Sequence, residues 1–403
     1  MRTDHRRVGL MAAVLVGLLL ASGAKADVTT DQSASILAFP KVLADGSHET
    51  VIQITNTSNA MVHAHCFYVN GGLTDPDGPD DIPNSGDEFA SAQNPPLWTE
   101  LDFDIWLTKQ QPTYWVVSQG RLVNSEDESC TRDDTSCPNA GFDPGRIPPV
   151  VDTFTGELKC IEVDASGAPL GGNHLKGEAT ILTVQQCDVP VGEEIGVCRG
   201  TSIPCEVAAT CPGTTGDAAK YNAIGIIGLP NNNGDGVLCL GGPEGPGCEF
   251  GAEYNACPQT WILNHLAGGA EDPVAGPGSS VETSIAVIPC AQDFETQIPE
   301  SVTIQFAIVN EFETVFSTST TVTCWANFVL TDIDPIFSEN SLGSEFVQTF
   351  MRPASGTNSG FLVVAGEVHN DNGNISTADM NLHVIGERTG TDKIVIPSEQ
   401  VTP

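Results

Sequence analysis

The chain has 403 residues, with 52 Asp and Glu against 16 Lys and Arg, and a formal net charge of −36 at pH 7. Such a surface repels nucleic acid and anionic lipid, so the composition excludes DNA and RNA as partners. Charged residues make up 17% of the chain while Thr, Val, Ile and Gly are plentiful, which favours strands over helices. The length exceeds that of a typical single domain and predicts two or more.

The N-terminus is typical of a signal peptide. Three arginines fall within the first seven residues, and residues 8–20 form an apolar run too short for a comfortable membrane span. Small residues flank Lys25 in 24–26, so we expect cleavage before Asp27. The alternative is that this N-terminal segment is not cleaved and stays as a membrane anchor. We therefore predict an exported protein that is extracellular, cell-surface or periplasmic, with no integral membrane segment in its mature form.

Residues 27–125 predict a first antiparallel β domain. Short strands separated by polar turns indicate a meander or Greek key, not a βαβ unit. A long acidic loop is expected at 74–96, where Asp, Pro and Gly are frequent. The expected strands are 36–39, ended by Pro40, followed by 51–55, 61–69, 101–107 and 114–117.

Residues 126–278 predict a loop-rich insertion held by disulfide bonds. Ten of the thirteen cysteines lie in this stretch, among many Gly and Pro residues, and this density requires an oxidising compartment. Strands at 156–163 and 179–184 within it could complete the first domain. The one helix expected is a short one at 258–266.

The cysteine spacing favours disulfides over metal binding, because no C-x-x-C pair occurs. We expect one bond between Cys290 and Cys324 in the second β domain and one between Cys66 and Cys160 in the first. The remaining candidates are close pairs in the insertion, namely Cys130 and Cys137, Cys198 and Cys205, and Cys239 and Cys248.

Residues 279–403 predict a second β domain. Apolar residues alternate with polar ones over 302–308 and again over 318–328, as a strand with one buried face requires. Further strands are expected at 361–365 and 380–385. An internal duplication is also considered, in which 36–40 corresponds to 285–289 and 50–53 to 302–305; 156–158 would correspond to 360–362.

A Pro-bounded strand, the Val51-Ile52-Gln53-Ile54 strand, the turn at 56–59 and a Cys-bearing strand follow one another in the first domain. This order resembles Ig-like modules of exported bacterial surface proteins. The resemblance covers 30–120 and 280–400, implies adhesion, scaffolding or display, and transfers no functional residue. The fold expected is mostly β, with two antiparallel Ig-like β-sandwich domains and a disulfide-stapled, loop-rich insertion.

Two groups of residues could bind metal. His63 and His65 lie at strand spacing on one face and could begin a Zn or Cu site, although no third ligand can be named. Asn231, Asn233 and Asp235 partly match the opening of a calcium loop, but the acidic residue expected twelve positions in is missing. Half-exposed strand histidines and ordinary polar turns are the alternative interpretations. No other cofactor is expected.

No reaction-specific motif is found, and no catalytic residue is predicted. The leading hypothesis is an exported, non-enzymatic structural, adhesive or binding protein whose partner is an unknown extracellular protein or glycan. The alternative is a secreted carbohydrate-binding protein or hydrolase with a site built from loops. Trp98, Trp106 and Trp115 would supply its stacking surface, and core packing is the competing role for these rings.

Overall fold

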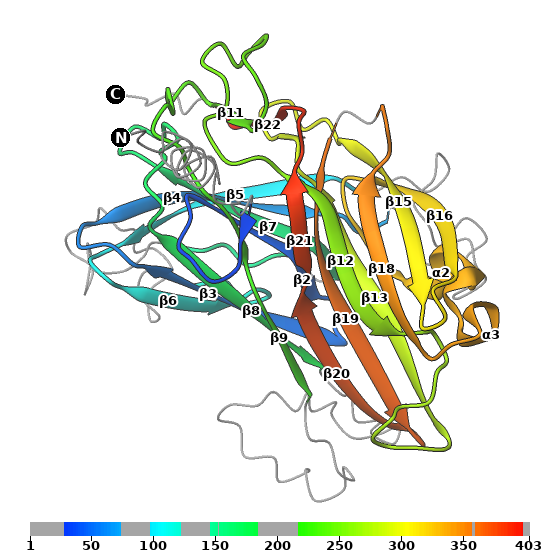
Figure 1. Cartoon of the computed structure of the whole chain (residues 1–403). Coiled ribbons are helices and arrows are strands. Elements are labelled where there is room, and N and C mark those ends of the chain that lie inside the picture. The colour runs from blue at the N-terminus through cyan, green and yellow to red at the C-terminus, as the bar shows by residue number, and fades with distance from the viewer. Residues whose placement is uncertain are drawn as a thin grey trace, which may run out of the picture.

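The structure is a computed structural model that describes residues 28–73, 97–121, 146–183 and 217–397, except 152, 357 and 358. These residues form mostly β structure in five sheets, here numbered I to V. Figure 1 shows β3 (His48–Asn56), β6 (Pro112–Val116) and β8 (Leu175–Thr183) on the left of the molecule, and β15 (Ser301–Asn310), β16 (Val315–Thr323) and β18 (Phe346–Pro353) on the right. The expected acidic loop at 74–96 and the signal peptide lie outside the described residues.

Sheets I and II gather strands from the first half of the chain together with β9 and β10. In spatial order, sheet I contains β1 (Val28–Thr29), β10 (Ile224–Ile226), β2 (Ile36–Ala44), β7 (Phe154–Val163), β4 (Val62–Asn70) and β5 (Thr99–Leu107). Sheet II contains β6 (Pro112–Val116), β3 (His48–Asn56), β8 (Leu175–Thr183) and β9 (Ala218–Asn222). Strand β2 packs against β3 and β8, so the apolar faces of these two sheets bury each other.

Sheets III, IV and V gather the later strands. Sheet III contains β16 (Val315–Thr323), β15 (Ser301–Asn310), β18 (Phe346–Pro353), β12 (Pro258–Leu266) and β21 (His383–Glu387). Sheet IV contains β17 (Ala326–Val329), β13 (Ser279–Pro289), β19 (Phe361–Asp371) and β20 (Asn374–Asn381). Sheet V contains β11 (Val237–Leu240), β22 (Asp392–Val395) and β14 (Gln292–Asp293). Three short helices follow β17, namely α2 (Leu330–Ile333), η2 (Pro335–Phe337) and α3 (Glu339–Leu342).

The prediction of two Ig-like β-sandwich domains with a stapled insertion is wrong. Five small sheets take a five-bladed, propeller-like arrangement. One hydrophobic core runs through both halves of the chain. The expected insertion is not separate either, because its strands β7 to β10 and β12 are distributed among sheets I, II and III. The sheets differ from WD40 or Kelch blades, since neighbours in a sheet are mostly not neighbours in sequence.

Several local expectations also change. Pro40 does not end its strand; β2 continues through it at a β-bulge between Phe39 and Val42, a position where a strand tolerates proline. The segment 318–328 divides into β16 and β17, because Cys324 takes a left-handed backbone with φ of 66°. The helix expected at 258–266 is strand β12, whose run of Trp, Ile and Leu packs between β18 and β21.

Three disulfide bonds occur among the described residues. The Cys66–Cys160 bond is the predicted one and joins directly opposed residues of β4 and β7. The Cys239–Cys248 bond closes the predicted short loop. The predicted Cys290–Cys324 bond is wrong, because Cys290 is bonded to Cys257 while Cys324 is a buried free thiol. The candidates Cys130, Cys137, Cys198 and Cys205 lie outside the described residues.

The disulfides indicate an oxidising environment for the folded protein. Among the described residues, no helix has both the length and the apolar character needed to cross a membrane.

Candidate functional site

The two predicted histidines lie on one face of β4, and both are buried. His63 stacks on Trp106 with ring centroids 3.8 Å apart, and its Nε2 lies 2.7 Å from Asp104 Oδ1. Its Nδ1 is 2.9 Å from the carbonyl oxygen of Asp164. Both ring nitrogens of His63 therefore already have protein partners.

His65, two residues further along β4, has the same kind of environment. Its Nε2 lies 3.2 Å from Asp102 Oδ2, and this hydrogen bond holds the pKa of the Asp102 carboxyl below its usual value. The ring also stacks on Phe67. Each histidine is thus matched with a carboxylate of β5, and the expected half-exposed position is wrong because sheet I is covered on both sides of β4.

One group of cysteine and carboxylate side chains has the spacing of a metal site, but its sulfur atoms cannot bind a metal ion. Among the described residues, Cys257, Cys290 and Asp392 form the one group of three close donor atoms. The two sulfurs form a disulfide, so neither is available as a thiolate ligand. His63 and His65 belong to no such group.

The predicted calcium residues form a polar turn that leads into β11. The Oδ1 of Asn233 accepts from the backbone N–H of Asp235 at 2.9 Å, and Asp235 Oδ1 accepts from Val237 N at 2.9 Å. Asn231 directs its amide nitrogen toward the carbonyl oxygen of Phe250 at 3.2 Å. The loop's own donors therefore occupy side-chain oxygens that a Ca²⁺ ion would need.

A calcium titration tests this loop. We expect the same Tm in millimolar CaCl2 and in EDTA, because a ligand stabilises a fold only when it binds the folded state. Differential scanning fluorimetry in the two buffers measures the difference, with MgCl2 as the ionic-strength control. A higher Tm in CaCl2 that Asp235→Ala abolishes would show that the turn rearranges into a calcium site.

Two of the three tryptophans considered for sugar stacking are buried, and the third, Trp106, is half-buried. Trp98 and Trp115 are buried, and Trp115 Nε1 donates to the hydroxyl of Tyr68. Trp106 has one ring face against His63. The three rings therefore do not form an exposed platform, and core packing is the role that the structure favours for Trp98 and Trp115.

A buried polar cluster lies where sheet I meets sheet V, and no sequence pattern pointed to it. Glu157 and Lys159 are on β7, Gln292 is on β14, and at most 1% of each residue is exposed. Lys159 Nζ lies 2.9 Å from Glu157 Oε2 and also donates to Gln292 Oε1, while Gln292 Nε2 donates to Glu157 Oε1. The three groups form a closed ring of hydrogen bonds.

A second candidate lies at the surface, on the outward face of β16, β15, β18 and β12 in sheet III, here called the outer face. It contains no Asp or Glu, and its one charged side chain is Arg352. Its residues are Val315, Ser317, Ser319, Thr321, Thr323, Ser301, Thr303, Gln305, Ala307, Val309, Phe346, Gln348, Phe350, Arg352, Thr260, Ile262 and Asn264. In a chain with a net charge of −36, this face therefore carries one cation and no acidic side chain.

Hydroxyl groups order part of the outer face. Thr303 and Thr321 are hydrogen-bonded through their side chains at 2.8 Å, and Ser301 and Thr323 at 2.7 Å. A shallow depression of about 670 Å³ lies beside them, with Phe350 and Arg352 among its lining residues. The face thus offers hydroxyls, an aromatic ring and one cation.

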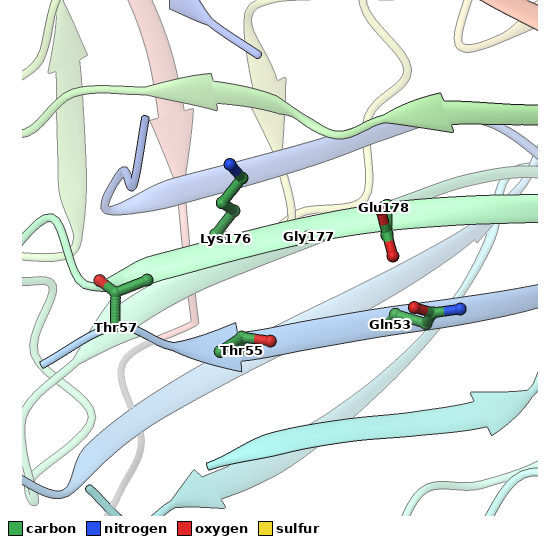
Figure 2. A pocket seen from close by; sticks show the side chains of 6 residues that line it. All are labelled: Gln53, Thr55, Thr57, Lys176, Gly177 and Glu178. Atoms are coloured by element: carbon green, nitrogen blue, oxygen red, sulfur yellow. The ribbon is translucent and has the colours of Figure 1, made fainter. Parts of the chain in front are cut away.

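A smaller hollow of about 240 Å³ lies on the outward side of sheet II. Figure 2 shows Gln53 and Thr55 on β3 beside Lys176 and Glu178 on β8. Both charged groups have partners, since Glu178 forms a 2.7 Å ion pair with Lys220, and Lys176 donates to a backbone carbonyl. This hollow is therefore a weaker candidate for binding than the outer face.

Comparison with family models, curated proteins and solved structures returns no match. The resemblance to Ig-like surface modules consequently receives no support from relatives, and the site has to be judged on its own chemistry. The described residues provide two candidates, the outer face and the buried Glu157–Lys159–Gln292 cluster. The outer face is open to a partner, whereas the cluster is buried and no external substrate can reach it.

Proposed function

We propose that this is an exported, non-enzymatic structural or adhesive protein that contacts an uncharged partner surface through its outer face. The observation that carries the proposal is the lack of acidic side chains over four strands of a strongly acidic molecule. The rest of the molecular surface is acidic and repels other acidic surfaces. On the outer face, the close approach of a partner costs little electrostatic energy.

The side chains of the outer face suit a neutral partner. Serine and threonine hydroxyls donate and accept hydrogen bonds, and Phe350 adds apolar area next to Arg352. Strands hold these groups in fixed positions, which lowers the entropy lost on binding. The open shape of the depression supports contact with an extended surface more than enclosure of a small substrate. Export is supported by the disulfides and by the predicted signal peptide.

Surface plasmon resonance tests the proposed contact with three immobilised probes: dextran as a neutral polysaccharide, a second copy of the chain, and heparin as a polyanion. We expect binding to dextran or to the second copy and none to heparin. The double substitution Ser317→Glu and Ser319→Glu should abolish that binding, because the partner would then have to bury two carboxylates in the contact.

The matched control adds the same charge to the other sheet, with Gln53→Glu and Thr55→Glu in the hollow of Figure 2. These surface substitutions should leave stability within about 0.5 kcal/mol of the wild type and binding unchanged. Equal loss in both double variants would indicate a general charge effect and count against the outer face. Binding to heparin alone would contradict the proposal.

A further inference from the structure

The Glu157–Lys159–Gln292 cluster brings a primary amine, a carboxamide and a carboxyl group into mutual contact. Lys159 contacts both of the others, at 2.9 Å to Glu157 Oε2 and by a hydrogen bond to Gln292 Oε1. Glu157 contacts the lysine nitrogen with one oxygen and the glutamine nitrogen with the other. One carboxyl group therefore connects the amine to the amide nitrogen.

The surroundings of the cluster are buried and largely apolar. Phe67 lies directly opposite Lys159 in the sheet, and its ring stacks on Phe294 with centroids 4.2 Å apart. Both rings are buried, as is the nearby thiol of Cys324. Because Phe294 follows Gln292 closely on the chain, the same packing that closes the cluster also fixes the position of the carboxamide.

Burial also sets the protonation of the amine and the carboxyl group. Loss of hydration lowers the pKa of Lys159 and raises the pKa of Glu157, even though each partner's charge acts against its shift. Both directions favour the uncharged pair, a free amine beside a carboxylic acid. A neutral lysine amine is a nucleophile, whereas an ammonium group is not.

We propose that Lys159 and Gln292 are joined by an isopeptide bond that forms within the folded chain, with Glu157 carrying the proton. Lys159 Nζ attacks the side-chain carbonyl carbon of Gln292. The proton that Nζ loses passes to one Glu157 oxygen, and the other oxygen delivers a proton to Gln292 Nε2. The bond between that carbon and Nε2 breaks and ammonia leaves, so Glu157 ends as it began. No oxidant or other reactant is needed.

The geometry favours this reaction over a persistent ion pair. Reacting groups held in contact by the fold have effective concentrations of about 10⁵ M or more, so a sluggish amide exchange becomes feasible. Glu157 lies within the hydrogen-bond distance expected of a general acid–base group. A buried charged pair gains little net stability after desolvation, whereas the amide product is neutral. The bond would connect sheet I covalently to sheet V.

Mass spectrometry of the purified, disulfide-reduced chain tests the bond. We expect an intact mass lower than that of the sequence by one ammonia molecule, and a branched peptide that contains both Lys159 and Gln292. Fragmentation of that peptide separates the bond from ammonia loss at Asn–Gly steps. A full sequence mass with two separate linear peptides in the wild type would overturn the proposal, and this measurement needs no variant to fold.

Two variants assign the roles. Glu157→Gln keeps the size of the side chain but removes the proton carrier, so the branched peptide should be lost or reduced at least tenfold. Lys176→Met removes a lysine of sheet II whose Nζ donates to the carbonyl oxygen of Asp31 and not to the cluster, so it should leave the bond intact. A Glu157→Gln chain that forms the bond at the wild-type level would contradict the role of Glu157. The glutamate variants of the outer face should form the bond fully, which separates this proposal from the proposed function.

Discussion

Replacing Cys66 and Cys160 together with alanine should lower the free energy of unfolding by about 4–5 kcal/mol. Their bond connects residues 94 apart in sequence, so it restricts a long segment of the unfolded chain. On the chain-entropy model, the stabilisation grows with the length of the closed loop. Both cysteines are fully buried, so the substitution also removes core contacts.

The Cys239–Cys248 bond provides the matched control. It closes only nine residues, and the same model gives about 2.5 kcal/mol for its removal. Urea unfolding monitored by circular dichroism measures both double variants against the wild type. Equal losses, or a larger loss for the short loop, would show that loop length does not determine the stabilisation.

The strands were largely predictable because apolar alternation is local. The pattern at 302–308 and the run at 61–69 both lie in strands of the structure. The prediction of the Cys66–Cys160 bond is confirmed, because both cysteines lie in strands expected to belong to the first β domain, at 61–69 and 156–163. In the suspected duplication, β2 pairs with β7 and β13 pairs with β19, so the internal similarity corresponds to a shared pairing.

The arrangement of the sheets was not predictable, because alternation does not show what covers the second face of a strand. The Glu157–Lys159 pair illustrates the limit. Residues two apart on a strand share a face, and a polar pair there ordinarily faces solvent. In this fold sheet V covers that face, and Gln292 comes from 133 residues away along the chain. Local sequence carries no signal for such a contact.

The wrong partner predicted for Cys290 has a similar cause: it is bonded to Cys257 and not to Cys324. Cys257 was grouped with the insertion, whereas it directly precedes β12, a central strand of sheet III. The alternation over 318–328 places Cys324 within a strand, whereas its left-handed backbone marks the junction between β16 and β17. The first error comes from placing a boundary by composition, and the second from extending an alternating pattern past a break in the backbone.

Trp325→Ala should lower the free energy of unfolding by about 3–5 kcal/mol, because it removes a buried aromatic side chain from the contact between the two halves of the chain. Its Nε1 donates to the carbonyl oxygen of Pro40 at 2.8 Å, although the two residues are 285 apart in sequence. Gly71 lies so close that a Cβ there would be 2.3 Å from Trp325 Cβ. The Trp325 side chain therefore packs directly on the backbone of Gly71, where even the methyl group of an alanine would clash with it.

Three further variants separate the contributions at this contact. Trp325→Phe keeps most of the ring area and removes the N–H donor, so it should lose about 1 kcal/mol. Gly71→Ala should lose about 1–3 kcal/mol through overpacking against Trp325. Phe312→Ala removes an exposed aromatic ring and should change stability by less than about 0.5 kcal/mol.

Urea unfolding should show one transition for every variant, because a single core includes residues of both halves. If Trp325→Ala unfolds in two separate steps, the halves are independent cores and Trp325 is their main connection.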